Sequence, residues 1–139
     1  MMTLDQIEHE RAARKEALSA ARTAQRCIDV AALNELEIQH GDESVASVDV
    51  GRYSPGMLTL VVTRGLSRPE LKRYRDRTRK EGADMAAAAD EAAESCVLYP
   101  QKDSDAWGKI KDAVPGLATR VGVAAVHLAI GLEGLESKK

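Results

Sequence analysis

The fold is decided by residues 44–71, which read SVASVDVGRYSPGMLTLVVTRGLSRPEL. Two segments rich in β-branched residues, 44–50 and 57–63, flank a linker that carries Ser-Pro-Gly at positions 54–56. Alternation and β-branched side chains are typical of strands, and proline followed by glycine favours a turn. The stretch therefore predicts an antiparallel β-hairpin.

A third strand is expected just before this hairpin. Residues 36–40 (LEIQH) alternate and are followed by a break at Gly41-Asp42. So small a sheet is not stable alone in water, and a helix must cover one of its faces. We therefore expect a hairpin or a three-stranded antiparallel sheet that packs on a helix.

The end of the same stretch marks the start of a helix. Ser67 is a good N-cap, Pro69 falls in the first turn and Glu70 closes a capping box. Apolar residues then recur at steps of three, four or seven over 71–96, which predicts one helix of about thirty residues ending near Leu98. Gly82 is expected to kink or loosen its middle.

Two more helices are expected after Tyr99-Pro100, because the residue before a proline is pushed out of helical geometry. The first is short and starts near Asp103 or Ser104, and Pro115-Gly116 ends it. Its predicted inner residues are Trp107, Ile110 and Val114. The last helix has a predicted apolar stripe of Leu117, Val121, Ala124 or Ala125, Leu128 and Leu132.

Upstream of the sheet, the segment from Leu4 to about Val30 has no proline or glycine and predicts a long first helix. Arg11 and Arg14 interrupt its apolar stripe. The other stripe residues are Leu4, Ile7, Leu18, Ala21, Gln25 and Ile28. A weak stripe seldom supports an isolated helix, so this segment is expected to lean on the rest of the domain or on another chain.

These elements predict an α+β fold that is mainly helical, with a small antiparallel sheet packed on a long helix and a C-terminal helical pair. The expected divisions are an N-terminal helix over 1–33, which can protrude, a single α+β domain over 34–132, and a flexible polar tail over 133–139.

Composition narrows the function classes. The 139 residues carry a formal net charge of -2 and only 3% aromatic residues, none of them Phe. The core is therefore built from small aliphatic side chains, which bury little area and favour packing against partners. A disulfide scaffold, a disordered acidic tail and a globally basic nucleic-acid binder are excluded. Cys27 and Cys96 belong to no metal or redox spacing and are expected to be reduced, buried thiols of an intracellular protein.

The start of the chain is polar and charged, unlike a signal peptide, so we expect the protein to stay in the cytoplasm. The longest apolar stretch, 117–132, carries Arg120 and His127 and is shorter than the roughly 20 residues of a membrane span. We therefore expect no membrane partner.

No catalytic motif is evident. His9, His40 and His127 fall in different expected elements without metal-ligand spacing, and His127 is expected to be half-buried. The glycines do not form a phosphate-binding loop. The sequence predicts a protein that is not an enzyme and takes no cofactor or metal.

The charge pattern of the predicted helix over 67–98 is unusual. Its first half carries the basic residues Arg68, Lys72, Arg73, Arg75, Arg77 and Arg79. Its second half is acidic, which is the reverse of what the helix dipole favours. The pattern indicates either a solvated face or a surface that docks on the acidic half of another copy, on an acidic partner protein, or on phosphate. Nucleic acid is the least favoured of these, because the chain is net acidic and lacks interleaved aromatics.

A strip of small residues follows the last helix at steps of three and four. Its members are Ala118, Gly122, Ala125 and Ala129. Such a strip lets another backbone approach closely. It serves either internal helix packing or the association of two copies as a homo-oligomer.

The order of these motifs resembles small tailed-bacteriophage proteins of the tail assembly chaperone type, over about residues 36–132. The likeness is carried by the Ser-Arg-Pro-Glu helix start at 67–70, the Cys-Val-Leu-Tyr-Pro ending at 96–100, the helix with Trp107, and the Pro-Gly-Leu opening at 115–117. The long charged first helix departs from the shorter start expected of that family. This difference leaves open that the protein is a relative of that family that remains in the finished phage particle.

The resemblance implies a non-enzymatic role in the bacterial host: binding an aggregation-prone partner, such as the tape-measure protein or a neighbouring tail protein, during tail assembly. The first or last helix would supply the apolar face, and the basic half of the helix over 67–98 would steer the partner.

Two alternatives stay open. One is a structural virion component, a head, connector or tail accessory protein that self-assembles. The other is a nucleic-acid-binding regulator that depends on Arg73, Arg75, Arg77 and Arg79.

Overall fold

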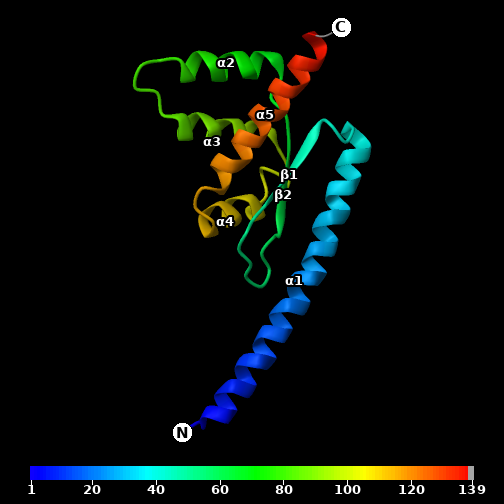
Figure 1. The fold of residues 1–139 in the computed structure, drawn as a ribbon, viewed down its shortest axis with the longest axis vertical. Helices are drawn as coiled ribbons and strands as arrows, with labels where there is room; N and C mark the ends of the chain where they lie inside the picture. The colour runs from blue at the N-terminus through cyan, green and yellow to red at the C-terminus, as the bar shows by residue number, and fades with distance from the viewer. Residues whose placement is uncertain (138–139) are drawn as a thin grey trace.

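The computed structural model describes residues 1–137, with side-chain environments through residue 131. The chain has an α+β fold, as predicted (Figure 1). Its elements, in order, are α1 (Leu4–His40), β1 (Val45–Asp49), β2 (Leu60–Arg64), α2 (Arg68–Thr78), α3 (Met85–Cys96), β3 (Val97–Tyr99), α4 (Asp105–Ala113) and α5 (Leu117–Ser137).

The sheet is antiparallel, with the strands in the order β1-β2-β3. The predicted hairpin is confirmed, with Val48 paired to Val61 and Val45 paired to Arg64. The predicted third strand is wrong, because residues 36–40 form the last turns of α1 and the third strand is β3. Leu33 and Leu36 are three residues apart and both pack against the sheet, which is the spacing of one face of a helix. The packing of this helical face outweighs the strand preference of the five alternating residues 36–40.

Helices cover both faces of the sheet, not one. Leu60 and Val62 of β2 pack with Leu33 and Leu36 of α1. The intervening Val61 points to the opposite face, as alternation along a strand requires. There it joins a core of residues from the other strands and the helices α3, α4 and α5. This core is formed by Val50, Val61, Ala93, Val97, Trp107, Ile110, Val114, Leu117 and Val121. Figure 1 shows α1 on one side of the sheet and the other helices on the opposite side.

The predicted single helix over 68–98 is two helices, and this corrects the sequence expectation. The capping box of Ser67 and Glu70 begins α2 as predicted. Gly82 adopts φ of +74°, which only glycine does at little cost, and Asp84 then caps a new helix by accepting a hydrogen bond from the Ala87 amide. The chain therefore reverses between α2 and α3, which lie side by side (Figure 1).

The C-terminal helical pair forms as predicted. Ser104 precedes α4, and the expected inner residues Trp107, Ile110 and Val114 are all buried. The predicted stripe of α5 is also buried at Leu117, Val121 and Ala125. Residues 133–137, expected to belong to a tail, continue α5. The side chain of Leu132 and the last two residues, 138–139, lie outside the described residues.

Candidate functional site

The first half of α1 extends from the domain without covering contacts. Every residue of 4–24 is exposed except the half-buried Leu18, and we call this segment the arm. In Figure 1 the arm is the blue part of α1, which points away from the sheet. Leu4 is 69% exposed and Ile7 is 42% exposed, so two large apolar side chains of the arm are uncovered. The arm is therefore the most prominent surface available to a partner.

Local signals make the arm helical to its first turn. Thr3 and Gln6 form a capping box, with the Thr3 Oγ1 accepting from the Gln6 amide and the Gln6 side chain accepting from the Thr3 amide. The segment that follows is rich in alanine, which has the highest helix propensity. Length and capping thus support the helix where tertiary contacts do not.

A buried carboxylate anchors the second half of α1 to the sheet. Asp29 is fully buried and accepts hydrogen bonds from the Thr59 amide at 2.6 Å, the Thr59 hydroxyl at 2.5 Å and the Tyr99 hydroxyl at 2.5 Å. Gln25, one turn earlier, donates to the same carboxylate at 2.9 Å. Burial and the Asp29 hydrogen bond both raise the pKa of Tyr99, so its hydroxyl stays protonated and remains a donor. These contacts hold α1 in a fixed direction.

Sequence reasoning missed this anchor. The predicted stripe placed Ile28 on the inner face, but Ile28 is 60% exposed and Asp29 takes its place. The available signal was spacing, because Asp29 lies four residues before Leu33 and four after Gln25. An acidic residue was not counted as a core position.

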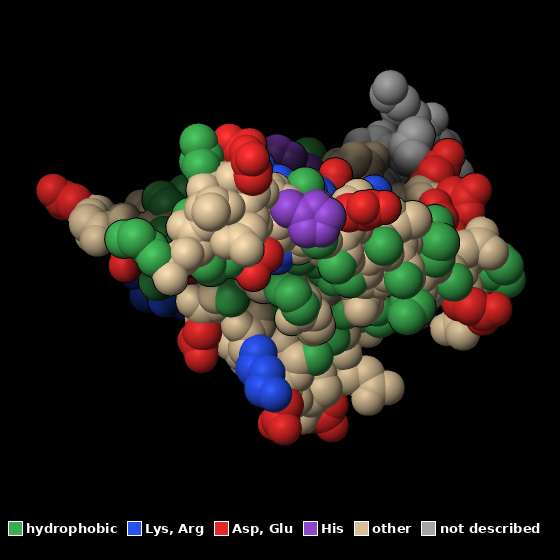
Figure 2. Space-filling model, turned by 90° about the horizontal axis from the view of Figure 1, so that it is seen from below, with side chains coloured by type: hydrophobic (Ala, Val, Ile, Leu, Met, Phe, Trp, Pro, Cys, Tyr) green, Lys and Arg blue, Asp and Glu red, His purple; other side chains and the backbone are tan. Residues whose placement is uncertain are grey.

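The inner face of α1 continues along the arm. Counting back from Asp29 and Gln25 by steps of three and four leads to the stripe over 4–18, whose members are Leu4, Ile7, Arg11, Arg14 and Leu18. We call these five residues the arm stripe. Within the described part of the chain, Arg11 and Arg14 form no ion pair. Figure 2, which views the molecule from below, shows hydrophobic side chains interspersed with other atoms across the middle of this face, and charged side chains mostly at its edges.

The helix break reduces the charge anomaly predicted for 67–98. Glu70 lies in the first turn of α2, and Arg75 and Arg77 lie in its last turn. Asp84 then stands at the N-terminus of α3. Each short helix therefore has acid at its start or base at its end, which is the arrangement that the helix dipole favours.

The six predicted basic residues lie on α2 and its C-cap, and one acidic residue of α3, Glu91, pairs with one of them in the same chain. Arg77 forms an ion pair with Glu91. Arg73 and Arg77 line a pocket of about 130 Å³ together with Tyr74 and Glu91. Arg68 and Arg75 also have interaction partners. Lys72 and Arg79 are exposed. For Arg77, the acidic counterpart expected on another copy is thus supplied within the chain.

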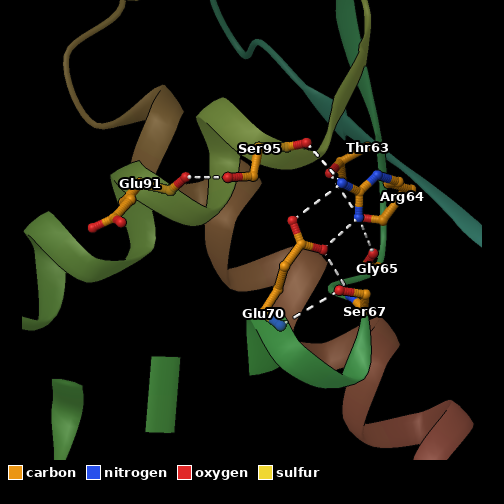
Figure 3. A network of polar contacts seen from close by, with 7 residues as sticks. All are labelled: Thr63, Arg64, Gly65, Ser67, Glu70, Glu91 and Ser95. Atoms are coloured by element: carbon orange, nitrogen blue, oxygen red, sulfur yellow. Dashed lines mark hydrogen bonds and ion pairs between the residues drawn. The ribbon is translucent and has the colours of Figure 1, made fainter. Parts of the chain in front are cut away.

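A polar cluster ties α2 and α3 to the sheet (Figure 3). Arg64 donates two hydrogen bonds to Glu70, at 2.8 and 3.2 Å, and others to the carbonyls of Gly65 and Ser95. The Arg64 hydrogen bonds lower the pKa of Glu70 to about 2, against the opposing effect of burial. The backbone and side chain of Ser67 contribute further. Because Glu70 also caps α2, one carboxylate fixes the start of α2 and, through Arg64, the end of α3.

The small-residue strip on α5 serves internal packing. Gly122, Ala125 and Ala129 are buried and Ala118 packs against the main core. A Cβ at Gly122 would lie 1.8 Å from the carbonyl oxygen of Ala89, so α5 and α3 touch at their backbones. The alternative use of this strip as a contact between copies does not fit, since three of its four residues are covered within the chain.

Other expected positions differ in detail. Cys96 is buried as predicted, and burial raises the pKa of its thiol to about 11. Cys27 was also predicted to be buried, but it is exposed. His127 is exposed, not half-buried, as are His9 and His40. No group of histidine, cysteine and carboxylate side chains among the described residues could hold a metal ion.

No single helix in the described range is both long and apolar enough to cross a membrane. Only α4 and α5 up to Gly131, taken together and bent by 109° at their break, pass such a test. Comparison with protein-family models, curated proteins and solved structures found no match to this chain.

Proposed function

We propose that this protein is a non-enzymatic factor of phage or prophage morphogenesis that binds a partner protein during tail assembly, as tail assembly chaperones do. The observation that carries the proposal is the arm, a helix of several turns that a fixed anchor at Asp29 holds away from its own domain. The order of motifs over 36–132 supplies the resemblance to the chaperone type.

The arm suits the binding of another helix. A helix that makes no tertiary contact is only marginally stable in water, and docking a second helix along its stripe removes that weakness. Helices that pair in this way use positions three and four residues apart, which is the spacing of the arm stripe. A partner such as the tape-measure protein, which is long and prone to aggregate, would have its amphipathic helices shielded in this manner.

The basic helix has a smaller part in this proposal than the sequence predicted. Arg77 is neutralised by Glu91, and Arg73 faces the same pocket between α2 and α3. The Arg77–Glu91 pair within one chain also weakens the charge argument for a self-assembling virion component. Exposed Lys72 and Arg79 remain able to steer an acidic partner at long range.

Co-expression of the full chain with the tape-measure protein of the same phage tests the proposal. We expect a complex that survives purification and an increase in soluble tape-measure protein. Absence of both would contradict it. Mass spectrometry of purified particles separates the alternative, since a chaperone leaves before the particle is complete and a structural component stays in it.

A further inference from the structure

We propose that the arm binds a helix whose contact face carries carboxylates at its centre and apolar side chains at both ends. This inference rests on the proposed function in one respect, that the partner is a protein. It adds the chemistry by which that partner is chosen.

The first argument is continuity with an interface that the structure contains. The face of α1 that packs on the sheet through Asp29, Leu33 and Leu36 is the same face that forms the arm stripe. In the second half of α1 this face is covered and in the arm it is bare. A second helix laid along the arm would extend an existing contact.

The second argument is charge. The arm stripe is apolar at Leu4, Ile7 and Leu18 but basic at Arg11 and Arg14. An arginine enclosed by an apolar helix face loses hydration without compensation, which is unfavourable. Carboxylates opposite the two arginines would instead form charge-assisted hydrogen bonds, which are among the strongest in proteins. The partner face must therefore alternate apolar, acidic and apolar over the length of the stripe, about 21 Å at 1.5 Å per residue.

A second copy of the chain fits this face poorly. If two arms paired in parallel and in register, Arg11 and Arg14 would each lie opposite the same residue of the other copy. If they paired antiparallel with Ile7 opposite Leu18, Arg11 would lie opposite Arg14. Like charges placed directly opposite one another disfavour association. Both of these registers disfavour a second copy, so we take the occupant to be a different, acidic helix.

A nucleic acid also fits poorly. The arm as a whole is neutral, because its four basic residues are matched by Asp5, Glu8, Glu10 and Glu16. A polyanion that follows the arm would meet these four carboxylates as well as the arginines, and phosphate binding depends on net positive charge. A helix laid along the stripe meets Arg11 and Arg14 at its centre, with Glu8 and Glu10 at the edges of the stripe.

The test uses the full chain and two fluorescently labelled 21-residue helical peptides. Both peptides have leucines placed to meet Leu4, Ile7 and Leu18, and they differ only in carrying two glutamates or two lysines opposite Arg11 and Arg14. We expect the glutamate peptide to bind at least about tenfold more tightly by fluorescence anisotropy. Equal binding, or tighter binding of the lysine peptide, would overturn the inference.

Two variants with matched charge locate the effect. Arg11→Gln/Arg14→Gln and Ala20→Glu/Thr23→Glu each lower the formal charge by two units, but the second pair lies on the opposite side of the arm. The first variant should lose the preference for glutamate and the second should keep it. Circular dichroism verifies that both fold, and an equal effect of the two variants would overturn the inference.

Two further measurements exclude the other occupants. Retardation of DNA or RNA that is lost in Arg11→Gln/Arg14→Gln would overturn the acidic-helix inference in favour of phosphate. Self-association of the parent chain that is lost in the same variant would overturn it in favour of a second copy. If co-expression yields a tape-measure complex that this variant leaves unchanged, the inference fails and the proposed function stands. If the preference for the glutamate peptide holds but no tape-measure complex forms, the proposed function fails and the inference stands.

Discussion

At the scale of single residues, Asp29 determines where α1 goes. Its carboxylate is fully buried, and donors from two other elements converge on it, with Thr59 preceding β2 and Tyr99 ending β3. A buried carboxylate is retained only where its hydrogen bonds are satisfied. The arm therefore owes its direction to one polar contact beside the packing of Leu33 and Leu36.

Asp29→Asn should destabilise the fold by about 2–3 kcal/mol, because an amide nitrogen, which cannot accept, would replace one of the two oxygens. It would then face either the Thr59 donors at Oδ2 or the Gln25 and Tyr99 donors at Oδ1. Urea denaturation followed by circular dichroism measures this change. Asp49→Asn is the matched control. Asp49 is 73% exposed and pairs with Arg26 on the surface, so its loss should cost less than about 1 kcal/mol. Equal costs for the two variants would contradict the anchor.

Glu70 predicts a dependence of stability on pH. The pKa of its carboxyl is about 2 in the folded chain, below the ordinary 4.5, so its stabilisation is present above pH 4.5 and is lost as the pH falls towards 2. Glu70→Gln should cost about 2 kcal/mol at pH 7, and the difference from the parent should shrink below pH 4.5. A difference in the free energy of unfolding that stays constant with pH would contradict this role.

At the scale of elements, the contact between α3 and α5 is set by a glycine. Gly122→Ala places a Cβ against the Ala89 carbonyl and should cost about 3 kcal/mol or more, since one backbone must move away from the other. Gly131→Ala, in the same helix but open to solvent, should stabilise the chain by about 0.5–1 kcal/mol through helix propensity. Thermal unfolding of the two variants should therefore shift in opposite directions, and a shared direction would refute the close approach.

Local signals predicted the elements that carry strong caps or alternation. The hairpin around Ser54-Pro55-Gly56, the start of α2 at Ser67 and the inner residues of α4 were all readable from the sequence. The break between α2 and α3 was not, because apolar spacing continues across Gly82 as if one helix ran through it. Only the left-handed backbone at Gly82 and the Asp84 cap distinguish the two arrangements.

The third strand was missed for a different reason. The strand Val97–Tyr99 is three residues long and follows α3 directly, so the hydrophobic pattern of the sequence does not change where it begins. The segment 36–40 alternates but belongs to α1, because the inner face of that helix reaches Leu36. Tertiary packing decided both cases. The arm stripe was recognised as an interrupted apolar stripe, and its arginines were visible from the sequence alone.

At the scale of the whole molecule, the chain consists of a domain whose sheet is covered on both faces, and of the arm, a helix that extends from this domain. The domain pairs Arg77 with Glu91 and packs its own small-residue strip, and the arm is a long part of the described chain that makes no tertiary contacts. This arrangement supports the proposal that a partner binds the arm, which is the central claim.

Hydrogen–deuterium exchange of the full chain, alone and with the co-expressed tape-measure protein, tests that claim most directly. The account predicts that amides of 4–24 exchange about a hundredfold more slowly when the partner is present at a hundred times its Kd, while those of β2 and α5 hardly change. Slowed exchange confined to α2 and α3, or no slowing of the arm in a complex that has formed, would contradict it.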